Sequence, residues 1–235
     1  MKKLLNEFVN RVKGAYGDDL VSVVLYGSAA SGEFHKKYSD LNVLCVLKQI
    51  ELKELERSSK LVQWWQKKKQ PPPMLLSLEE VENSHDAFPV EFLDIQENHQ
   101  VLYGRDVVVG IKIKTHQHRR QVEHELRAAL LRLRERYLGI QHDKKDVAKL
   151  MLDSLSSFST LFRHALILSG KVAPLKKSEI FRATAKRFSI SPEPFEILLK
   201  AREGVRKIEG SEVRRIFEAY MSQITSMTQA VDQLD

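Results

Sequence analysis

The sequence predicts an α/β domain followed by an all-helical domain. Before Gly110, short apolar runs of strand type alternate with amphipathic segments of helical spacing, as in an α/β sandwich; after it, only helical spacing recurs. The chain has 235 residues, 43% of them hydrophobic, which is enough for two separate cores. We therefore place one domain at residues 1–115 and a second at 116–235.

Two apolar runs define the predicted sheet of the first domain. Residues 21–26 and 41–47 are short, rich in β-branched side chains and bounded by turn residues, which is typical of strands buried on both faces. Apolar residues at helical spacing predict a helix over residues 2–14 in front of them. Further along the chain we expect a helix over 51–69 that ends before Pro71–Pro73, a strand over 74–78, a short helix or turn over 79–85, and a strand over 89–95.

The second domain is predicted to be a bundle of about five helices. The segment from Lys145 to Leu168 is apolar nearly all round, so we expect it to be the central, buried helix. The other helices are expected near residues 120–137, 178–188, 192–208 and 211–231.

Composition limits the classes of protein to which the chain can belong. No apolar run reaches the roughly 20 residues that a membrane-spanning helix needs, and the first residues lack the apolar stretch of a secretory signal. We therefore expect a soluble, cytoplasmic protein without a membrane partner. Its single cysteine, Cys45, lies within an apolar run and is predicted to be a buried, unreactive thiol.

The net charge of +7 belongs to the second domain. Residues 1–115 are balanced, with 16 basic and 16 acidic residues, so the whole excess lies in 116–235. A basic field favours anionic partners such as nucleotides, RNA or acidic metabolites, although Lys- and Arg-rich solvated helix faces give the same excess.

The most informative segment joins the two predicted strands. Gly27 and Ser28 follow the first strand, where backbone N–H groups at the start of a short helix can bind a phosphate. Asp40 opens the second strand, where a carboxylate is costly to bury unless a metal or another cation offsets its charge.

With Gly27-Ser28, Ser39-Asp40 and the apolar strand that follows, the sequence resembles the nucleotidyltransferase superfamily, which includes DNA polymerase beta and kanamycin nucleotidyltransferase. The resemblance covers residues 15–107 and implies a mixed sheet. In the family, two carboxylates in the order Asp-x-Asp or Asp-x-Glu and a third on a later strand hold the metal. The kanamycin-type enzymes also have an all-helical second domain that helps to bind the acceptor.

The resemblance implies an Mg²⁺-dependent transfer of a nucleoside monophosphate from a nucleoside triphosphate, with Mn²⁺ as an alternative metal. Asp40 matches the first carboxylate and Glu91 the third, as the base or as the metal ligand nearest the nucleophile. Asp94 is the alternative to Glu91; on a strand the two would face opposite sides. The implied nucleotide-binding residues are Gly27, Ser28, Ser39, Lys36 and Lys37, and His35 lies in the same loop.

The sequence departs from the family pattern at Asn42, which stands where the second carboxylate is expected. An amide oxygen can ligate Mg²⁺ but adds no negative charge, so we expect a weakened metal site formed by Asp40, Asn42 and Glu91. Two hypotheses stay open. The chain is either an active nucleotidyltransferase acting on a small molecule, a protein or an RNA end, or a nucleotide-binding or regulatory module, similar to half of a toxin–antitoxin pair.

Other features of the second domain carry weaker expectations. The histidines at 116, 118 and 124 are better explained by ordinary helix contacts than by a metal site. Arginines at 120, 127 and 134 form a stripe that could follow an RNA backbone, although pairing with Glu123 explains part of it. Polar residues between 154 and 164 could line an acceptor pocket, and the sequence leaves open whether the protein is a homodimer.

Overall fold

The computed structural model describes residues 1–30 and 40–234, with only the backbone of Ser28. The chain divides into two compact units, Met1–Lys114 and Thr115–Asp235, and each is described by itself. Among the described residues, no helix is long and apolar enough to cross a membrane.

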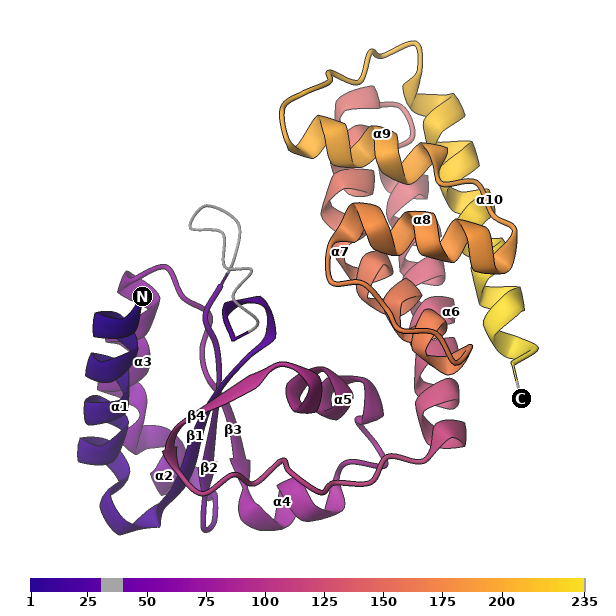
Figure 1. The fold of residues 1–235 in the computed structure, drawn as a ribbon. Coiled ribbons are helices and arrows are strands. Elements are labelled where there is room, and N and C mark those ends of the chain that lie inside the picture. Colours follow the sequence, from indigo (N-terminus) through magenta and orange to yellow (C-terminus); the bar gives the residue numbers. More distant parts are fainter. Residues whose placement is uncertain (31–39, 235) are drawn as a thin grey trace. The chain divides into compact units, whose positions relative to one another are not determined.

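The first unit is built on a mixed, four-stranded sheet, as the sequence predicts (Figure 1). Its strands are β1 (Leu20–Tyr26), β2 (Asn42–Leu47), β3 (Met74–Ser77) and β4 (His99–Gly104), in the order β3-β2-β1-β4. β1 is antiparallel to both β2 and β4, whereas β2 and β3 are parallel. The two strands predicted to be buried on both faces, β1 and β2, are therefore the central pair.

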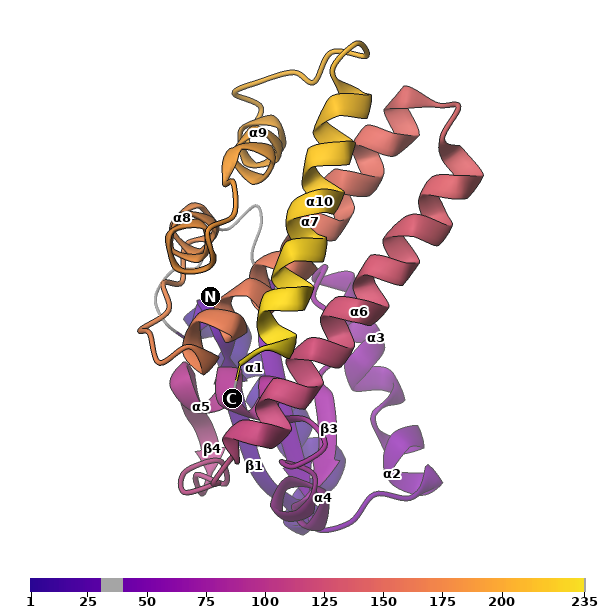
Figure 2. The ribbon, with the colours of Figure 1, turned by 90° about the vertical axis from the view of Figure 1, so that its right-hand side faces the viewer.

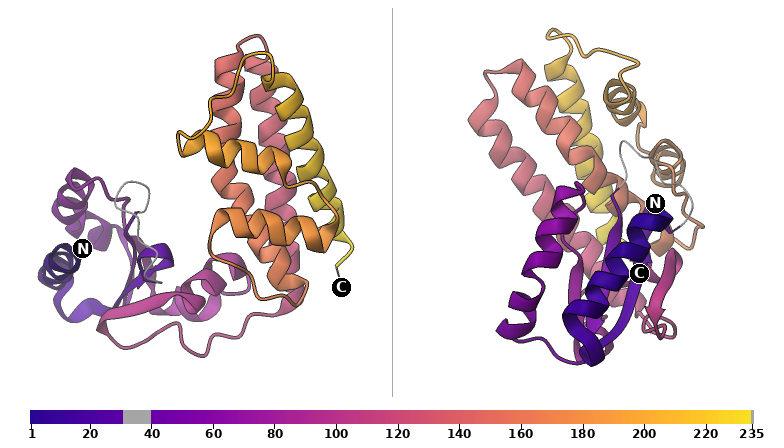
Figure 3. Two further views of the ribbon diagram at one scale, coloured as in Figure 1. Left: turned by 45° about the horizontal axis from the view of Figure 1, so that its top comes forward. Right: turned by 90° about the vertical axis from the view of Figure 1, so that its left-hand side faces the viewer.

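Helices cover both faces of this sheet (Figures 1 and 3). On one face lie α1 (Lys2–Tyr16), α2 (Leu52–Arg57) and α3 (Ser59–Lys67). On the other lie α4 (Leu78–Asn83) and α5 (Pro89–Glu97). Short 3-10 turns, η1 (Gly17–Asp19) and η2 (Gly27–Ala29), flank β1.

Side chains alternate between the two cores. Val43 and Cys45 of β2 pack with the α1 and α3 side, where the rings of Phe8 and Trp65 lie 4.4 Å apart. Leu44 and Val46 pack with the α4 and α5 side. Cys45 is 1% exposed, which confirms the predicted burial, and this burial raises the pKa of its thiol to about 12.

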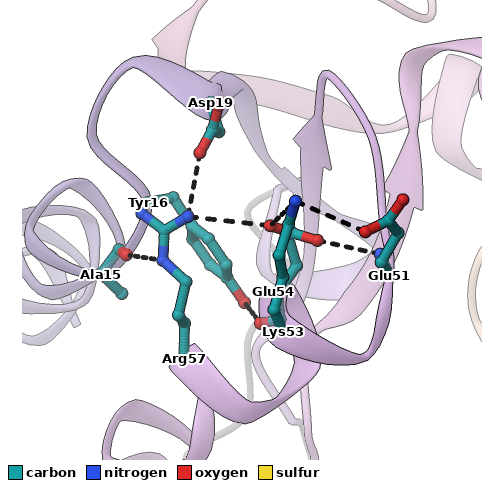
Figure 4. A network of polar contacts seen from close by, with 7 residues as sticks. All are labelled: Ala15, Tyr16, Asp19, Glu51, Lys53, Glu54 and Arg57. Atoms are coloured by element: carbon teal, nitrogen blue, oxygen red, sulfur yellow. Dashed lines mark hydrogen bonds and ion pairs between the residues drawn. The ribbon is translucent and has the colours of Figure 1, made fainter.

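A buried carboxylate ties α1, η1 and α2 together (Figure 4). Glu54 is 1% exposed; it accepts a hydrogen bond from its own helix cap, the Glu51 N–H, at 3.0 Å, and lies 3.8 Å from Arg57. Arg57 in turn donates to Asp19 and to the carbonyl of Ala15, both at 2.9 Å. These partners all belong to the scaffold, so this network has a structural role.

The second unit is a helical bundle, as predicted, with α6 (Thr115–Ile140), α7 (Lys144–Leu168), α8 (Lys177–Phe188), α9 (Glu193–Arg202) and α10 (Val213–Asp232). Three long helices, α6, α7 and α10, lie side by side, and α8 and α9 cross them (Figure 2). α7 packs against the other four and contributes twelve of its 25 residues to the core, which confirms it as the central helix.

Several sequence-based boundaries are wrong. Residues 89–95 form the helix α5 and no strand, because Pro89 occupies its first turn and Phe92 and Ile95 turn toward the sheet. The fourth strand is instead β4, which the sequence analysis does not predict. The helix expected over 51–69 is interrupted at Ser58, and α9 ends at Arg202, short of the expected residue 208.

Candidate functional site

Three residues mark one end of the sheet. Tyr26, at the last position of β1, lies opposite Asn42 of β2 and opposite His99 of β4. Tyr26 packs with the core on the α4 and α5 side. Asn42 has the same strand parity as Leu44 and Val46, which pack on that side as well. Because directly opposed residues of an antiparallel pair share a face, Tyr26, Asn42 and His99 all lie on the sheet face that α4 and α5 cover.

Gly27 is required by both its conformation and its neighbour. Its φ is +75°, and a Cβ placed there would lie 3.3 Å from Asn42 Nδ2. Its backbone N–H donates to the carbonyl of Asn98 at 3.0 Å. The N–H of Gly27 is therefore engaged by the α5–β4 junction, so Gly27 can favour phosphate binding through close approach of the chain, without donating its own hydrogen bond.

Glu91 and Asp94 both approach Tyr26. Burial raises the pKa of the Tyr26 phenol, and the negative charges of Glu91 and Asp94 raise it further. Because α5 is a helix, these carboxylates lie three residues apart on one face, which corrects the expectation that they point to opposite sides. Both therefore qualify for the third carboxylate.

Asp40 differs from its expected environment. It is exposed and lies before β2, which begins at Asn42, so the cost of burying its charge does not apply. Together with the α5 carboxylates and the Asn42 amide it offers oxygen ligands alone, which is the donor type that Mg²⁺ prefers. Among the described residues no group of three His, Cys, Asp or Glu side chains is arranged to hold a metal ion. The donor chemistry suits Mg²⁺, with an amide where the family has its second carboxylate.

Several predicted nucleotide-binding residues cannot be placed. His35, Lys36, Lys37 and Ser39 lie outside the described residues. Ser28 belongs to η2, directly after β1, which is the strand-to-turn position that its predicted role requires.

A pair of cations converges on one hydroxyl in the helical unit. Lys177 Nζ donates to Ser156 Oγ at 2.8 Å, and Arg202 Nη1 donates to the same oxygen at 2.6 Å. Burial lowers the pKa of Lys177, and the nearby positive charge of Arg202 lowers it further. Within the described part of the chain neither cation forms an ion pair. We call Ser156, Lys177 and Arg202 the basic cluster; its geometry suits an oxyanion, which would relieve the repulsion between the cations.

The sequence analysis misses the basic cluster because its members lie on three different helices. The one available signal is Ser156 on the polar edge of α7. Other residues of that edge face inward: Ser154 Oγ lies 3.0 Å from the Tyr220 hydroxyl, and His164 Nδ1 lies 2.8 Å from His118 Nε2 in the bundle core. His118 is therefore a packed core residue in contact with His164.

The arginine stripe of α6 is partly neutralised. Arg127 donates to Glu123 at 2.8 Å and lies 3.3 Å from Asp232, and Glu123 also accepts from Arg119. These contacts weaken the case for an RNA-binding face on this helix.

Comparisons with known proteins identify the family and the fold. A model of the nucleotidyltransferase domain matches residues 1–129. A Methanocaldococcus jannaschii protein, provisionally named a protein adenylyltransferase, is 35% identical over 57 residues, which are 24% of this chain and 38% of that protein's length. The crystal structure of the spectinomycin adenyltransferase AAD(9) from Enterococcus faecialis, with ATP and spectinomycin, superimposes with a TM-score of 0.61 at 16% identity. It covers 97% of this chain and 99% of that one, and it shows a shared fold.

Proposed function

The chain belongs to the nucleotidyltransferase family, and we propose that it transfers a nucleoside monophosphate from a nucleoside triphosphate to an acceptor hydroxyl, with release of pyrophosphate. The observation that carries this proposal is the end of the sheet, where the Gly27 turn, Asn42 and the α5 carboxylates lie on one face. Pyrophosphate release demands charge neutralisation and an aligned nucleophile, and these residue types can supply both.

Each residue has a distinct role in the proposed reaction. Asp40, the Asn42 amide oxygen and Glu91 would hold Mg²⁺, which would neutralise charge on the phosphate oxygens and help to align the α-phosphate. Glu91, or Asp94 in its place, would accept the proton of the acceptor hydroxyl. Gly27 and Ser28 would approach the phosphates at the end of β1.

The second unit offers a separate candidate for anion binding. Two cations that share one serine oxygen form a preorganised binding site for a phosphate group. We assign Lys177 and Arg202 to phosphate binding within this unit.

Asn42 supports a second candidate function. An amide in place of a carboxylate removes one negative charge from the metal site, so a module that binds nucleotide with little transfer is the alternative. The acceptor is the other open choice: the similar proteins are described as acting on a protein or as bound to spectinomycin, and an RNA end is also compatible with the family. Whether the protein forms a homodimer is tested on the purified protein that is used for the transfer assays.

The transfer proposal is tested with labelled nucleoside triphosphates, Mg²⁺ or Mn²⁺, and panels of small-molecule, protein and RNA acceptors. We expect labelled product and pyrophosphate, both lost in Asp40→Ala. If no acceptor is labelled and Asp40→Ala leaves nucleotide affinity unchanged, the enzyme proposal is wrong.

Asn42→Asp separates the two candidates. Restoring the carboxylate should raise metal affinity or transfer rate by about tenfold if the native site is attenuated, because a carboxylate adds a negative charge to the metal site that the amide lacks. An unchanged rate and affinity in a correctly folded variant would show that the amide serves the native chemistry equally well.

A further inference from the structure

His99 is held by two acceptors at the junction of α5 and β4. Its Nδ1 lies 3.1 Å from the carbonyl oxygen of Gln96, in the last turn of α5, and its Nε2 lies 3.0 Å from Asp106 Oδ2. Neither a carbonyl nor a carboxylate oxygen can donate a hydrogen bond. Both ring nitrogens must therefore carry protons for both contacts to form, which describes the charged imidazolium.

The partners of His99 are themselves tied to the segment after β4. Asp106 Oδ1 accepts from the N–H groups of Val108 and Val109, at 3.1 and 3.2 Å. The Gln96 side chain donates to the carbonyls of Val108 and Ile111, at 2.8 and 2.9 Å. Residues 106–111 thus close over the end of α5, with the imidazole as the bridge between them.

The same junction reaches the candidate site. Asn98, the residue before His99, accepts the N–H of Gly27, and His99 lies opposite Tyr26 across the strand pair. Tyr26 is the residue that the α5 carboxylates approach. The end of α5 is therefore fixed to the same end of the sheet at which Glu91 and Asp94 would act.

We propose that the His99 imidazolium and the Asp106 carboxylate form a charged clamp that positions α5, and with it Glu91 and Asp94, for transfer. His99 is a positioning residue, since its contacts are with α5 and residue 106. The expected effect of the clamp on the transfer rate rests on the proposed function. Its expected effect on the position of α5 rests on the contacts of His99 and Asp106 alone. Transfer should fall as His99 loses its proton.

The groups around the clamp favour the charged forms of both His99 and Asp106. Burial lowers the pKa of His99, but its hydrogen bonds to Asp106 and Gln96 outweigh burial, and the net pKa is raised. Burial raises the pKa of Asp106, and the bonds from His99, Val108 and Val109 more than reverse this, so it is lowered. On the α5 side, the backbone of Gln96 and of Ile95 hydrogen-bonds to His99, and Tyr26 of β1 lies opposite His99 in the strand pair. Asp106 also lines a hollow with Glu82, His85, Arg105 and Lys112.

The sign of the pH dependence follows from these shifts. Because folding raises the pKa of His99, the charged imidazole stabilises the folded state. This stabilisation is complete below the ordinary pKa of histidine and is lost as pH rises through the pKa of His99 in the folded protein. Because folding lowers the pKa of Asp106, its ionised carboxylate also stabilises the folded state. This stabilisation is present above the ordinary pKa of aspartate and is lost as pH falls through the pKa of Asp106 in the folded protein. The clamp is therefore closed at intermediate pH and opens on the alkaline side through His99.

The test combines NMR titration of the His99 ring, transfer rates against pH, and amide hydrogen exchange. In the wild type, kcat should fall as pH rises through the pKa of His99. Asp106→Asn should lower this pKa and shift the fall in kcat to lower pH by the same amount. His99→Gln should lower kcat about tenfold, remove this inflection and leave the KM for the nucleotide nearly unchanged, as expected for a misplaced catalytic group. His85→Gln is the matched control, because His85 is half-buried and, among the described residues, its side-chain hydrogen bond is to the Glu82 carbonyl at 3.0 Å.

The possible outcomes separate the clamp from the proposed function. Transfer whose pH profile is the same in wild type and Asp106→Asn overturns the clamp alone. If the wild type transfers nothing, the proposed function fails, and hydrogen exchange decides the clamp: His99→Gln should accelerate exchange in α5, in residues 106–111 and at Gly27, and nowhere else. Unchanged exchange there, or an equal increase throughout the first unit, overturns it.

Discussion

The two units carry clusters of opposite charge. In the first unit, Glu91 and Asp94 approach the half-buried Tyr26, and in the second, Lys177 and Arg202 share the oxygen of Ser156. Both arrangements perturb a neighbour in the direction that like charges require: the pKa of Tyr26 is raised by burial and the acids, and that of Lys177 is lowered by burial and Arg202.

The difference between the clusters indicates that they suit different ligands. Carboxylates bind cations such as Mg²⁺, whereas Lys and Arg bind phosphate groups directly. Variants of the two clusters should therefore fail in different ways.

The largest effect is expected at the acidic end. Glu91→Gln should reduce kcat by about 10²–10³-fold, the range typical of removing one general base or charge-stabilising group, with a small change in nucleotide affinity. Asp94→Asn is the matched variant on the same helix face. If Asp94→Asn has the larger effect, the roles of the two residues are exchanged; if neither slows transfer, the acidic end does not perform the chemistry.

Neutralising the basic cluster should weaken binding more than it slows the reaction. Lys177→Gln and Arg202→Gln should each raise the nucleotide Kd by about 10–100-fold, since a hydrogen bond to a charged group contributes about 1.5–3 kcal/mol. Calorimetric titration at two salt concentrations measures this loss. Lys176→Gln is the control, because exposed Lys176 lies near Glu179 and outside the cluster. Equal losses in all three variants would point to a diffuse field in place of a site.

A third variant tests a carboxylate that belongs to neither cluster. Glu54→Gln should lower the free energy of unfolding by about 1–3 kcal/mol, because it weakens a buried, charge-assisted network. Chemical denaturation measures this change, and transfer by the folded protein should be unaltered. A loss of transfer without a loss of stability would show that the network of Figure 4 has a role beyond the scaffold.

The smallest effect is expected at Ser156. Its hydroxyl accepts from both cations, but a bound phosphate would offer them stronger acceptors. Ser156→Ala should therefore change the nucleotide Kd by about threefold or less, within the range of a single neutral hydrogen bond. An effect as large as that of Lys177→Gln would mean that the serine itself contacts the ligand.

The sequence predicted the parts of the fold that depend on burial of contiguous residues. β1 and β2 are nearly continuous apolar runs because both of their faces are covered, and α7 is apolar nearly all round because it lies at the centre of the bundle. The family resemblance rested on Gly27 and Asp40 within the same segments, and the domain match confirms it.

The failures have a common cause in short segments. Residues 89–95 contain too few apolar positions to distinguish a strand from a helix by spacing, and Pro89 was the neglected sign of a helix start. β4 begins with His99 and Gln100, whose polarity hides a strand that is paired along only one edge.

The sequence by itself determined the two-part fold, the family and the turn at Gly27, because local periodicity and spacing record which residues are buried and where the chain must bend. Only the tertiary structure decided that Glu91 and Asp94 share a helix face, that His99 meets Asp106, and that Lys177 and Arg202 converge on one serine. Such polar contacts join residues from different elements, and they depend on strand register and helix packing, which no local pattern encodes.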